Sequence, residues 1–491
     1  MMQKPKYDEQ HIGKTGSPLE STNGHSSRIE SKPSASRGRH QEHEGAGIMD
    51  ETPAPTVHVA ANTSAQHHRP GRKPTTMQSG THKKGGAKPL KAHSLIDKVY
   101  RWENLMRAYQ RVRRNKGAHG LDRVTLRMFS ADLEKHLREI QRKLMQRRYQ
   151  WQPVRRVYIP KSSNPKEHRP LGVPTVADRI VGQALIQVLD PIFDNLLSDR
   201  SFAYRKGRKA HDAITTIWAD VQQGYCYAAD CDVRACFDNL SHHVVMSRIR
   251  ERVADGRVLD LLEAYLVAGV YVDGNVSVPE RGVPQGGAIS PWMMNLVLDG
   301  LDSAIEQSPY RIVRYADDFV VLCRSRNEAN HAMSLVKEVL ETLQLSLNDD
   351  KSRVVSVRDG LTFLGFRFHR RGVGISPKAI DRFKEKVRST TRRNQGINIE
   401  MVTAKLVPVV RGWANYYGVA DCAYRFRMLD AWIRMRLRAF RLKRRCCHDN
   451  WRIPDKRLRR WGYLSLLQCR PTVRLSFTLA PTPRRGECGS L

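Results

Sequence analysis

Two adjacent acidic residues inside an apolar hairpin restrict this chain more than any other feature of its sequence. The segment 311–323 is predicted to form two strands joined by the turn Ala316-Asp317-Asp318. Like charges side by side in a half-buried hairpin repel each other, so each carboxyl group resists ionising. A bound divalent cation removes that cost, and magnesium prefers acidic oxygen ligands. Taken alone, the pair leaves two interpretations equally open, a metal site and a solvated turn.

A second acidic strand favours the metal site. The segment 227–233 is strand-like and carries Asp232, and a short turn then leads to Phe237. If the two strands are neighbours, Asp232, Asp317 and Asp318 can hold two magnesium ions about 3.5–4 Å apart. One ion would activate a primer hydroxyl and the other would stabilise the leaving pyrophosphate. Phosphoryl transfer needs little beyond that geometry and charge.

The rest of the sequence predicts a mixed α+β centre between helical flanks. Asp178 is the expected N-cap of a long helix that breaks at Pro191, and Asp273-Gly274 is the expected turn of a tight hairpin. The other expected elements are helical pieces over 95–149, a strand over 154–159 that stops at Pro160, a one-sided helix over 329–343, a strand over 361–368 and basic helices from about 376.

The charge balance points to a nucleic-acid partner. Lys and Arg number 84 against 49 Asp and Glu, a formal charge of +35. Such a chain attracts phosphates, with an acidic membrane surface as the second choice. No apolar run reaches the roughly 18 residues that a bilayer requires, and residues 1–9 do not resemble a signal peptide. We therefore expect no membrane partner and a cytoplasmic, bacterial location, with association with the nucleoid as an option.

Two further segments bear on organisation and metal binding. Residues 1–92 are rich in Ser, Gly, Pro and His and poor in large apolar residues, which predicts a disordered basic tail. Nine cysteines are scattered along the chain without a paired framework. Cys446, Cys447 and His448 could supply half of a zinc site, but the sequence offers no second half. We expect ordinary reduced thiols.

A series of motifs resembles the group II intron reverse transcriptase/maturase family over roughly residues 94–440. The polymerase motifs are Asp232 with Phe237, Gly282–Pro291 and Tyr315–Asp318. The further matches are Asn115–Gly117 with Gly120 and Asp122, Lys161 with Arg169–Pro174, Phe202–Arg205, Asn348–Ser352, Phe363–Phe366 and Arg411–Tyr417. Several motifs in the same order make agreement by chance negligible.

The resemblance implies a right-hand polymerase fold and an RNA-directed DNA polymerase that makes cDNA from a primer. The expected parts are a tail over 1–92, fingers over 93–225, an antiparallel-sheet palm over 226–369, a helical thumb or maturase (X) domain over 370–462 and a short C-terminal tail over 463–491. The implied partners are an RNA template, intron RNA, a DNA primer or target and deoxynucleoside triphosphates. A maturase role in intron splicing and mobility is the implied second activity.

The same resemblance implies roles for individual side chains. Asp232, Asp317 and Asp318 would hold two Mg²⁺ ions, and Phe237 would lie under the incoming sugar and exclude a 2′-hydroxyl. The remaining substrate contacts would be made by Lys161 and Arg169 on the triphosphate, by Gln285 in the nucleotide and template pocket, and by Lys351 as a general acid or a charge partner. Surface charge is the alternative for Lys161 and Arg169.

The basic C-terminal part is the expected RNA-binding region. Between residues 425 and 460, fourteen Lys or Arg stand against three acids, while an apolar stripe at helical spacing runs through them. One helix face would pack on the protein and the other would contact a phosphate backbone. The candidate RNA-binding residues are Arg411, Trp413, Tyr416, Tyr417, Arg434, Arg438, Arg441, Lys443 and Arg444. For the aromatic residues, core packing is the alternative to stacking on bases.

Departures from the family pattern leave other interpretations open. Arg123 stands where the family often has glycine, and no HNH endonuclease motif follows Arg460. A CRISPR-associated, retron or diversity-generating reverse transcriptase is one alternative, and a splicing cofactor with an inactive polymerase is another. An RNA-dependent RNA polymerase is disfavoured, because those enzymes usually carry glycine where Ala316 stands. The intron, the target site and the oligomeric state are not predicted.

Overall fold

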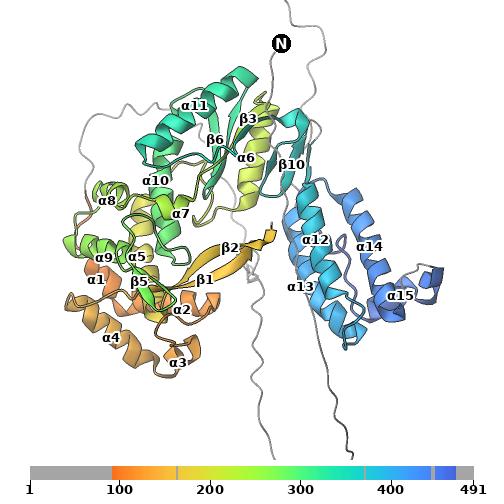
Figure 1. The fold of residues 1–491 in the computed structure, drawn as a ribbon, viewed down its shortest axis with the longest axis horizontal. Helices are drawn as coiled ribbons and strands as arrows, with labels where there is room; N and C mark the ends of the chain where they lie inside the picture. Colours follow the sequence, from red (N-terminus) through yellow and green to blue (C-terminus); the bar gives the residue numbers. More distant parts are fainter. Residues whose placement is uncertain (1–90, 162–163, 370–371, 444–447, 472–491) are drawn as a thin grey trace, which may run out of the picture. The chain divides into compact units, whose positions relative to one another are not determined.

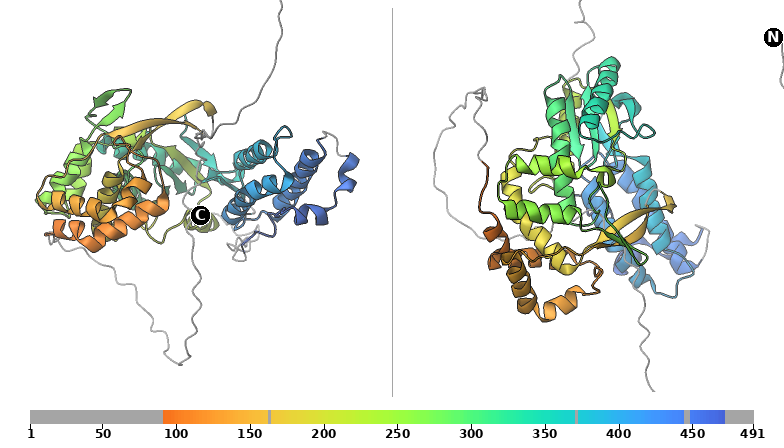
Figure 2. Two further views of the ribbon diagram at one scale, coloured as in Figure 1. Left: turned by 90° about the horizontal axis from the view of Figure 1, so that it is seen from below. Right: turned by 60° about the vertical axis from the view of Figure 1, so that its left-hand side comes forward.

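The computed structural model describes residues 91–161, 164–369, 372–443 and 448–471, which all belong to one unit of the chain. It confirms the expected mixture of helices and strands (Figures 1 and 2). The predicted N-terminal tail lies outside the described residues except for its last two positions, as do Cys446, Cys447 and most of the predicted C-terminal tail. Among the residues described, no helix is long and apolar enough to cross a membrane.

The N-terminal helices form as the apolar spacing predicts. They are α1 (Ile96–Tyr100), α2 (Trp102–Asn115), α3 (Leu126–Ala131), α4 (Leu133–Met145) and α5 (Val176–Phe193). The N-cap of α5 is Thr175 rather than Asp178, because the Thr175 hydroxyl accepts the backbone N–H of Asp178 at 3.0 Å. Pro191 also does not break this helix. It lies in the last turn of α5, and the helix ends two residues later at Phe193.

A four-stranded sheet has the strand order β2-β1-β4-β5. Its strands are β1 (Val154–Lys161), β2 (Asn164–Val173), β4 (Val270–Val272) and β5 (Asn275–Ser277). Strand β1 continues through Pro160, contrary to the prediction, since β4 pairs only with its first two residues and leaves the proline N position without a ladder partner. The predicted β4–β5 hairpin is confirmed, with positive φ at both Asp273 and Gly274.

The central sheet is antiparallel and has the order β6-β7-β3-β8. Its strands are β3 (Tyr227–Asp232), β6 (Arg311–Tyr315), β7 (Asp318–Cys323) and β8 (Arg353–Ser356). Alternate residues of a strand point to opposite faces. In β7, Phe319 and Val321 enter one core, whereas Val320 and Leu322 enter another. The sheet is therefore covered on both faces, which explains the continuous apolar run after Asp318.

Helices from distant parts of the sequence cover the two faces. The first core contains residues of α10 (Ile289–Glu306) and α11 (Arg326–Thr342), and the second contains residues of α6 (Ala210–Gln222). Helix α11 begins at the Ser325 cap and confirms the predicted one-sided helix. The shorter helices α7 (Cys236–Asn239), α8 (His242–Arg250) and α9 (Gly256–Leu266) lie between β3 and β4 in the sequence.

The segment 361–368 is a hairpin and not the single strand that was predicted. Strand β9 (Thr362–Phe363) turns at Leu364 and Gly365 into β10 (Phe366–His369), and both turn residues have positive φ. A Cβ atom on Gly365 would lie 2.4 Å from the Tyr417 hydroxyl, so this turn requires glycine. Strand β11 (Gly372–Ile375) completes a small sheet.

The C-terminal part is helical, as predicted. It contains α12 (Pro377–Thr390), α13 (Ile399–Tyr417), α14 (Ala423–Leu442) and α15 (Asp455–Arg460), with a 3₁₀ turn over His448–Arg452. The first three of these helices lie side by side in Figures 1 and 2 and share the second core with β9–β11. This core joins the C-terminal helices to one face of the central sheet.

Candidate active site

The three predicted aspartates meet at one end of the central sheet. Asp232 is the last residue of β3 and lies directly opposite Asp318, the first residue of β7. Asp318 is also paired with Tyr315 across the β6–β7 hairpin, so Ala316 and Asp317 form its turn. The hairpin predicted over 311–323 is thus confirmed. Its register brings Asp317 and Asp318 to the end of the strand that carries Asp232.

Burial and mutual repulsion disfavour ionisation of these carboxyl groups. Burial raises the pKa of Asp318 to about 7, and the charges of Asp230, Asp317 and Asp232 add to the shift while Lys351 opposes it. Burial also raises the pKa of Asp317 and of Asp230. Asp230 faces Arg353 of β8 and forms an ion pair with it at 3.5 Å. Such crowding of anions is what a divalent cation would relieve.

Asp232 has cationic and amide partners from the turn before β8. Its Oδ2 atom accepts Lys351 Nζ at 2.8 Å and Asn348 Nδ2 at 3.0 Å. Its backbone N–H donates to Ser352 Oγ at 3.2 Å. In the described part of the chain, no three His, Cys, Asp or Glu side chains converge in an arrangement that could hold a metal ion. The backbone register suits a carboxylate metal site, whereas the Asp232 side chain is turned toward Lys351 and Asn348.

A glycine-rich loop connects this end of the sheet to the β1–β2 hairpin. Phe237 of α7 is half-buried, and its carbonyl accepts the Val283 N–H at 2.7 Å. The Gln285 carbonyl accepts the Gly172 N–H of β2 at 2.5 Å. Gly286 has φ +120°, and a Cβ atom there would lie 2.0 Å from the Gly172 carbonyl oxygen. As expected from the sequence, glycine permits close backbone approach in this loop.

The two expected triphosphate ligands lie on that hairpin. Arg169 is exposed on β2, opposite Ile159 of β1. The backbone of Lys161 ends β1, but its side chain lies outside the described residues. The loop contacts therefore bring the strand of Arg169 next to the segment that carries Gln285.

The aromatic residues of the α13 motif pack inside the protein. Trp413 stacks on Phe383 with 4.3 Å between ring centroids, and Tyr417 is 8% exposed. The Tyr416 hydroxyl donates to the Leu364 carbonyl at 3.0 Å, which ties α13 to the β9–β10 turn. Core packing, the alternative left open by the sequence, is what the structure contains. Stacking of these rings on bases stays a prediction.

Some of the candidate RNA-binding cations on and just after α14 have partners in other segments of the chain. Arg434 and Arg438 contact the Asp455 carboxylate at 3.3 and 2.6 Å. Lys443 donates to the Arg393 carbonyl at 2.7 Å. Arg441 is exposed on α14, Arg411 is exposed on α13, and Arg444 lies outside the described residues. Arg434 and Arg438 thus have an acidic partner within the chain at the start of α15, and their role in RNA binding stays a prediction.

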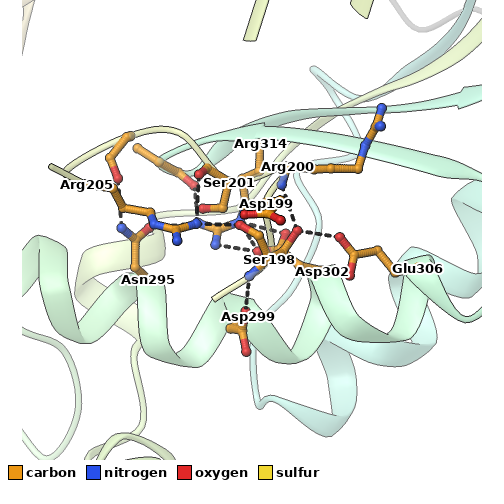
Figure 3. A network of polar contacts seen from close by, with 12 residues as sticks. Ser198, Asp199, Arg200, Ser201, Arg205, Asn295, Asp299, Asp302, Glu306 and Arg314 are labelled. Carbon is orange, nitrogen blue, oxygen red and sulfur yellow. Dashed lines mark hydrogen bonds and ion pairs between the residues drawn. The ribbon is translucent and has the colours of Figure 1, made fainter. Parts of the chain in front are cut away.

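Sequence reasoning missed a buried polar network around Arg314, which precedes Asp317 by three residues (Figure 3). Arg314 is 0% exposed and pairs with Asp302 of α10, which is also 0% exposed. Asn295 of α10 contacts the same guanidinium group. A charged residue within the apolar run Ile312–Val313 and Phe319–Cys323 was a visible signal. Its partners lie in another element and could not be identified from spacing.

The cysteines in the described part of the chain agree with the expectation of ordinary reduced thiols. The described cysteines are Cys226, Cys231, Cys236, Cys323, Cys422 and Cys469, and none of these is in a disulfide. Burial raises the pKa of the Cys231 thiol, on β3, well above its usual range, so this thiol is not prepared for reaction.

Two family models match this chain. The model described as reverse transcriptase (RNA-dependent DNA polymerase) matches residues 159–368, which include the three aspartates, Phe237 and Gln285. The model described as group II intron, maturase-specific domain matches residues 380–462, which include most of α12 and all of α13, α14 and α15. The two matches follow each other along the described chain.

Curated proteins resemble this chain over different shares of its length and of their own. Protein YkfC of Escherichia coli is 31% identical over 325 residues, which are 57% of this chain and 84% of YkfC. The group II intron-encoded protein LtrA of Lactococcus lactis is 30% identical over 250 residues, 50% of this chain and 40% of LtrA. A Candida albicans telomerase structure covers 62% of this chain and 59% of its own at 15% identity and a TM-score of 0.39, too low to argue from.

Proposed function

This chain belongs to the group II intron reverse transcriptase/maturase family, and on that premise we propose that Asp232, Asp317 and Asp318 hold two magnesium ions for cDNA synthesis. Its reverse transcriptase domain makes it an RNA-directed DNA polymerase, and its family generally uses divalent metal ions. The observation that carries the proposal is the register that sets Asp232 opposite Asp318, beside the turn of Asp317.

The chemistry divides between the ions and the side chains. Bound magnesium would activate the primer hydroxyl and stabilise the leaving pyrophosphate. The three carboxylates hold the ions, Lys161 and Arg169 offer positive charge to the triphosphate, and Gln285 lines the nucleotide pocket. Lys351 Nζ lies 2.8 Å from Asp232 Oδ2, and this short distance supports a role as charge partner better than a role as general acid. We assign the fingers to 93–225, the palm to 226–369 and the thumb or maturase domain to 370–462.

The maturase-specific match supports a second activity in intron splicing. The chain covers 84% of YkfC but only 40% of LtrA, so the RNA and DNA partners of this particular chain are proposals. We propose intron RNA and an RNA template as its RNA partners, a DNA primer or target strand, and action in a bacterial cytoplasm. The exposed Arg411 and Arg441 supply positive charge for an RNA backbone.

Primer extension tests the polymerase. Purified protein is given an RNA template, a DNA primer, deoxynucleotides and magnesium, and a parallel reaction contains excess EDTA. We expect cDNA with magnesium and none with EDTA. A folded protein that binds the RNA tightly but makes no cDNA with magnesium would favour the splicing cofactor with an inactive polymerase.

Magnesium binding is expected to release protons near neutral pH. The pKa of Asp318 is raised to about 7, so part of this carboxyl group is protonated at pH 6.5 in the metal-free protein. A metal ion requires the ionised form, and magnesium affinity should therefore rise with pH through about 7. Calorimetric titration in two buffers of different ionisation enthalpy measures the protons released. Buffer-independent heats at pH 6.5 would contradict the prediction.

The same shift has a defined sign for stability. The unfolded carboxyl group has a pKa near 3.9, so folding of the metal-free chain favours the protonated form. Its contribution to stability is present below about pH 4 and is lost as the pH rises through about 7. In EDTA, the melting temperature of the wild type should fall over this range relative to Asp318→Asn, which cannot titrate. Magnesium should reduce the difference.

Substitution of Phe237 by alanine is expected to admit ribonucleotides. The half-buried ring would occupy the space of a 2′-hydroxyl group, and forcing an extra group against a packed ring costs about 1–3 kcal/mol. We expect the preference for deoxynucleotides over ribonucleotides, measured as a ratio of kcat/KM values, to fall roughly 10- to 100-fold. Phe237→Tyr keeps the bulk and should keep the preference. An unchanged ratio in Phe237→Ala would refute the gate.

A further inference from the structure

Arg314 is a fully buried cation three residues before Asp317. It lies in β6, and its side chain is 0% exposed. A buried charge is costly unless it is paired and fully hydrogen-bonded. Partners of the Arg314 guanidinium group must therefore offset the cost of burying its charge. Most of them belong to α10 (Figure 3).

The guanidinium group of Arg314 is oriented by two side chains of α10. Its Nε donates to Asp302 Oδ1 at 2.8 Å, and one terminal nitrogen, Nη2, donates to Asp302 Oδ2 at 2.5 Å. The other terminal nitrogen, Nη1, donates to Asn295 Oδ1 at 2.8 Å. Asp302 and Asn295 are buried, so this planar group has one defined orientation.

The oriented guanidinium group also contacts the aspartate turn. Nη1 donates to the Ala316 carbonyl at 3.1 Å. Ala316 has φ +63°, a left-handed conformation that L-residues adopt only when their surroundings hold them there. The Ala316 carbonyl and the Asp317 N–H belong to the same planar peptide group. Holding that carbonyl therefore fixes the orientation of the peptide plane that leads into Asp317.

Helix α10 connects this contact to other parts of the site. It begins at Ile289, just after the loop that carries Gln285. Asn295 Nδ2 also donates to the Ala203 carbonyl at 2.9 Å. The backbone of Arg314 bonds to the same segment, because its N–H donates to Arg200 O and its carbonyl accepts from Phe202 N, both at 3.0 Å. Helix α10 is thus connected to the turn of Ala316 and Asp317, to the loop that carries Gln285 and to the segment 200–203.

We propose that Arg314, held by Asp302 and Asn295, is a positioning residue that sets the metal-binding geometry of Asp317 and Asp318. It contacts no substrate and acts through the Ala316 carbonyl. The inference rests on the proposed function, since it assumes that these two aspartates bind the ions. Loss of the contact should leave folding and template binding in place and weaken the response to the metal.

Arg314→Lys is the direct test. Lysine keeps the positive charge beside Asp302, but its compact ammonium group lacks the planar fork with which the guanidinium group reaches Asp302, Asn295 and the Ala316 carbonyl. We expect the magnesium concentration for half-maximal primer extension to rise about 10-fold, as for the loss of a buried hydrogen bond. Direct Mn²⁺ binding, followed by calorimetry without substrate, should weaken by a similar factor. Binding of primer–template should stay within about 2-fold of wild type.

Asp299→Asn is the matched control. Asp299 lies on α10 in the same network and accepts the Ser198 N–H at 3.0 Å, and none of its described hydrogen bonds reaches Arg314. It should leave both metal readouts unchanged. If Arg314→Lys does not fold, Asn295→Ala replaces it, because this change frees one side of the guanidinium group and keeps the Asp302 pair. A shift of about 3-fold in the same direction is then expected.

The outcomes separate the two proposals. A folded Arg314→Lys or Asn295→Ala variant with the metal response of Asp299→Asn overturns the positioning role. A wild type that makes no cDNA counts against the proposed polymerase function, and the Mn²⁺ titration then still decides whether Arg314 sets metal affinity.

Discussion

Replacement of Asp317 and Asp318 together by alanine is expected to reduce magnesium-dependent primer extension by at least roughly 1000-fold. Metal ions supply several kcal/mol of transition-state stabilisation, and each 1.4 kcal/mol corresponds to about a factor of ten in rate. The stability of the folded protein should not fall, because burial and repulsion raise the pKa of both carboxyl groups and so make their charged forms unfavourable in the folded state. We therefore expect the metal-free double variant to melt at the same temperature as wild type or higher, the trade of stability for function seen at strained sites.

The measurement compares single-turnover extension rates and primer–template affinity of wild type and variant. Glu338→Ala with Glu341→Ala is the matched control, since it removes two negative charges from the exposed side of α11. The control should keep the wild-type rate. Residual extension by the aspartate variant within about 10-fold of wild type, at unchanged template affinity, would show that these carboxylates are not the metal ligands.

The position of the aspartates was predictable because it depends on local patterns. Apolar strand residues flank Asp317 and Asp318, and a two-stranded hairpin with this turn has little freedom in register. The alternation in the β4–β5 hairpin and the spacing in α11 were equally local. The pairing of β3 with β7 was a hypothesis from the chemistry. It is confirmed as a backbone register, while metal binding itself stays a prediction.

Other features depend on contacts between distant segments. The turn at Leu364 and Gly365 packs against Tyr416 and Tyr417 of α13, and the segment 361–368 alone does not reveal these contacts, although Gly365 is a turn signal. Arg434 and Arg438 have the spacing of a free basic face. Their partner Asp455 lies beside them only because the chain after α14 folds back against this helix. Charge spacing on one helix therefore predicts exposure poorly when an acid lies further along the chain.

Asp302→Ala is expected to destabilise the protein by about 3–5 kcal/mol, because it leaves the Arg314 charge buried without its carboxylate partner. Both side chains are 0% exposed, so the guanidinium group is out of contact with water in the folded protein. The free energy of unfolding is measured by urea titration, with the slope of the transition checked for two-state behaviour. Asp349→Ala removes an exposed acid that pairs with Lys337 at 2.7 Å, and this control should cost no more than about 1 kcal/mol.

The double variant Arg314→Met with Asp302→Leu tests the reason for this loss. Replacing both charges with apolar side chains of similar size removes the uncompensated charge, so most of the stability lost in Asp302→Ala should return. An equally unstable double variant would mean that shape, and not buried charge, causes the loss. A stable double variant has no guanidinium group to hold the Ala316 carbonyl. It should therefore fold well and still need more magnesium than wild type, which separates the contribution of this pair to stability from its contribution to the aspartate turn.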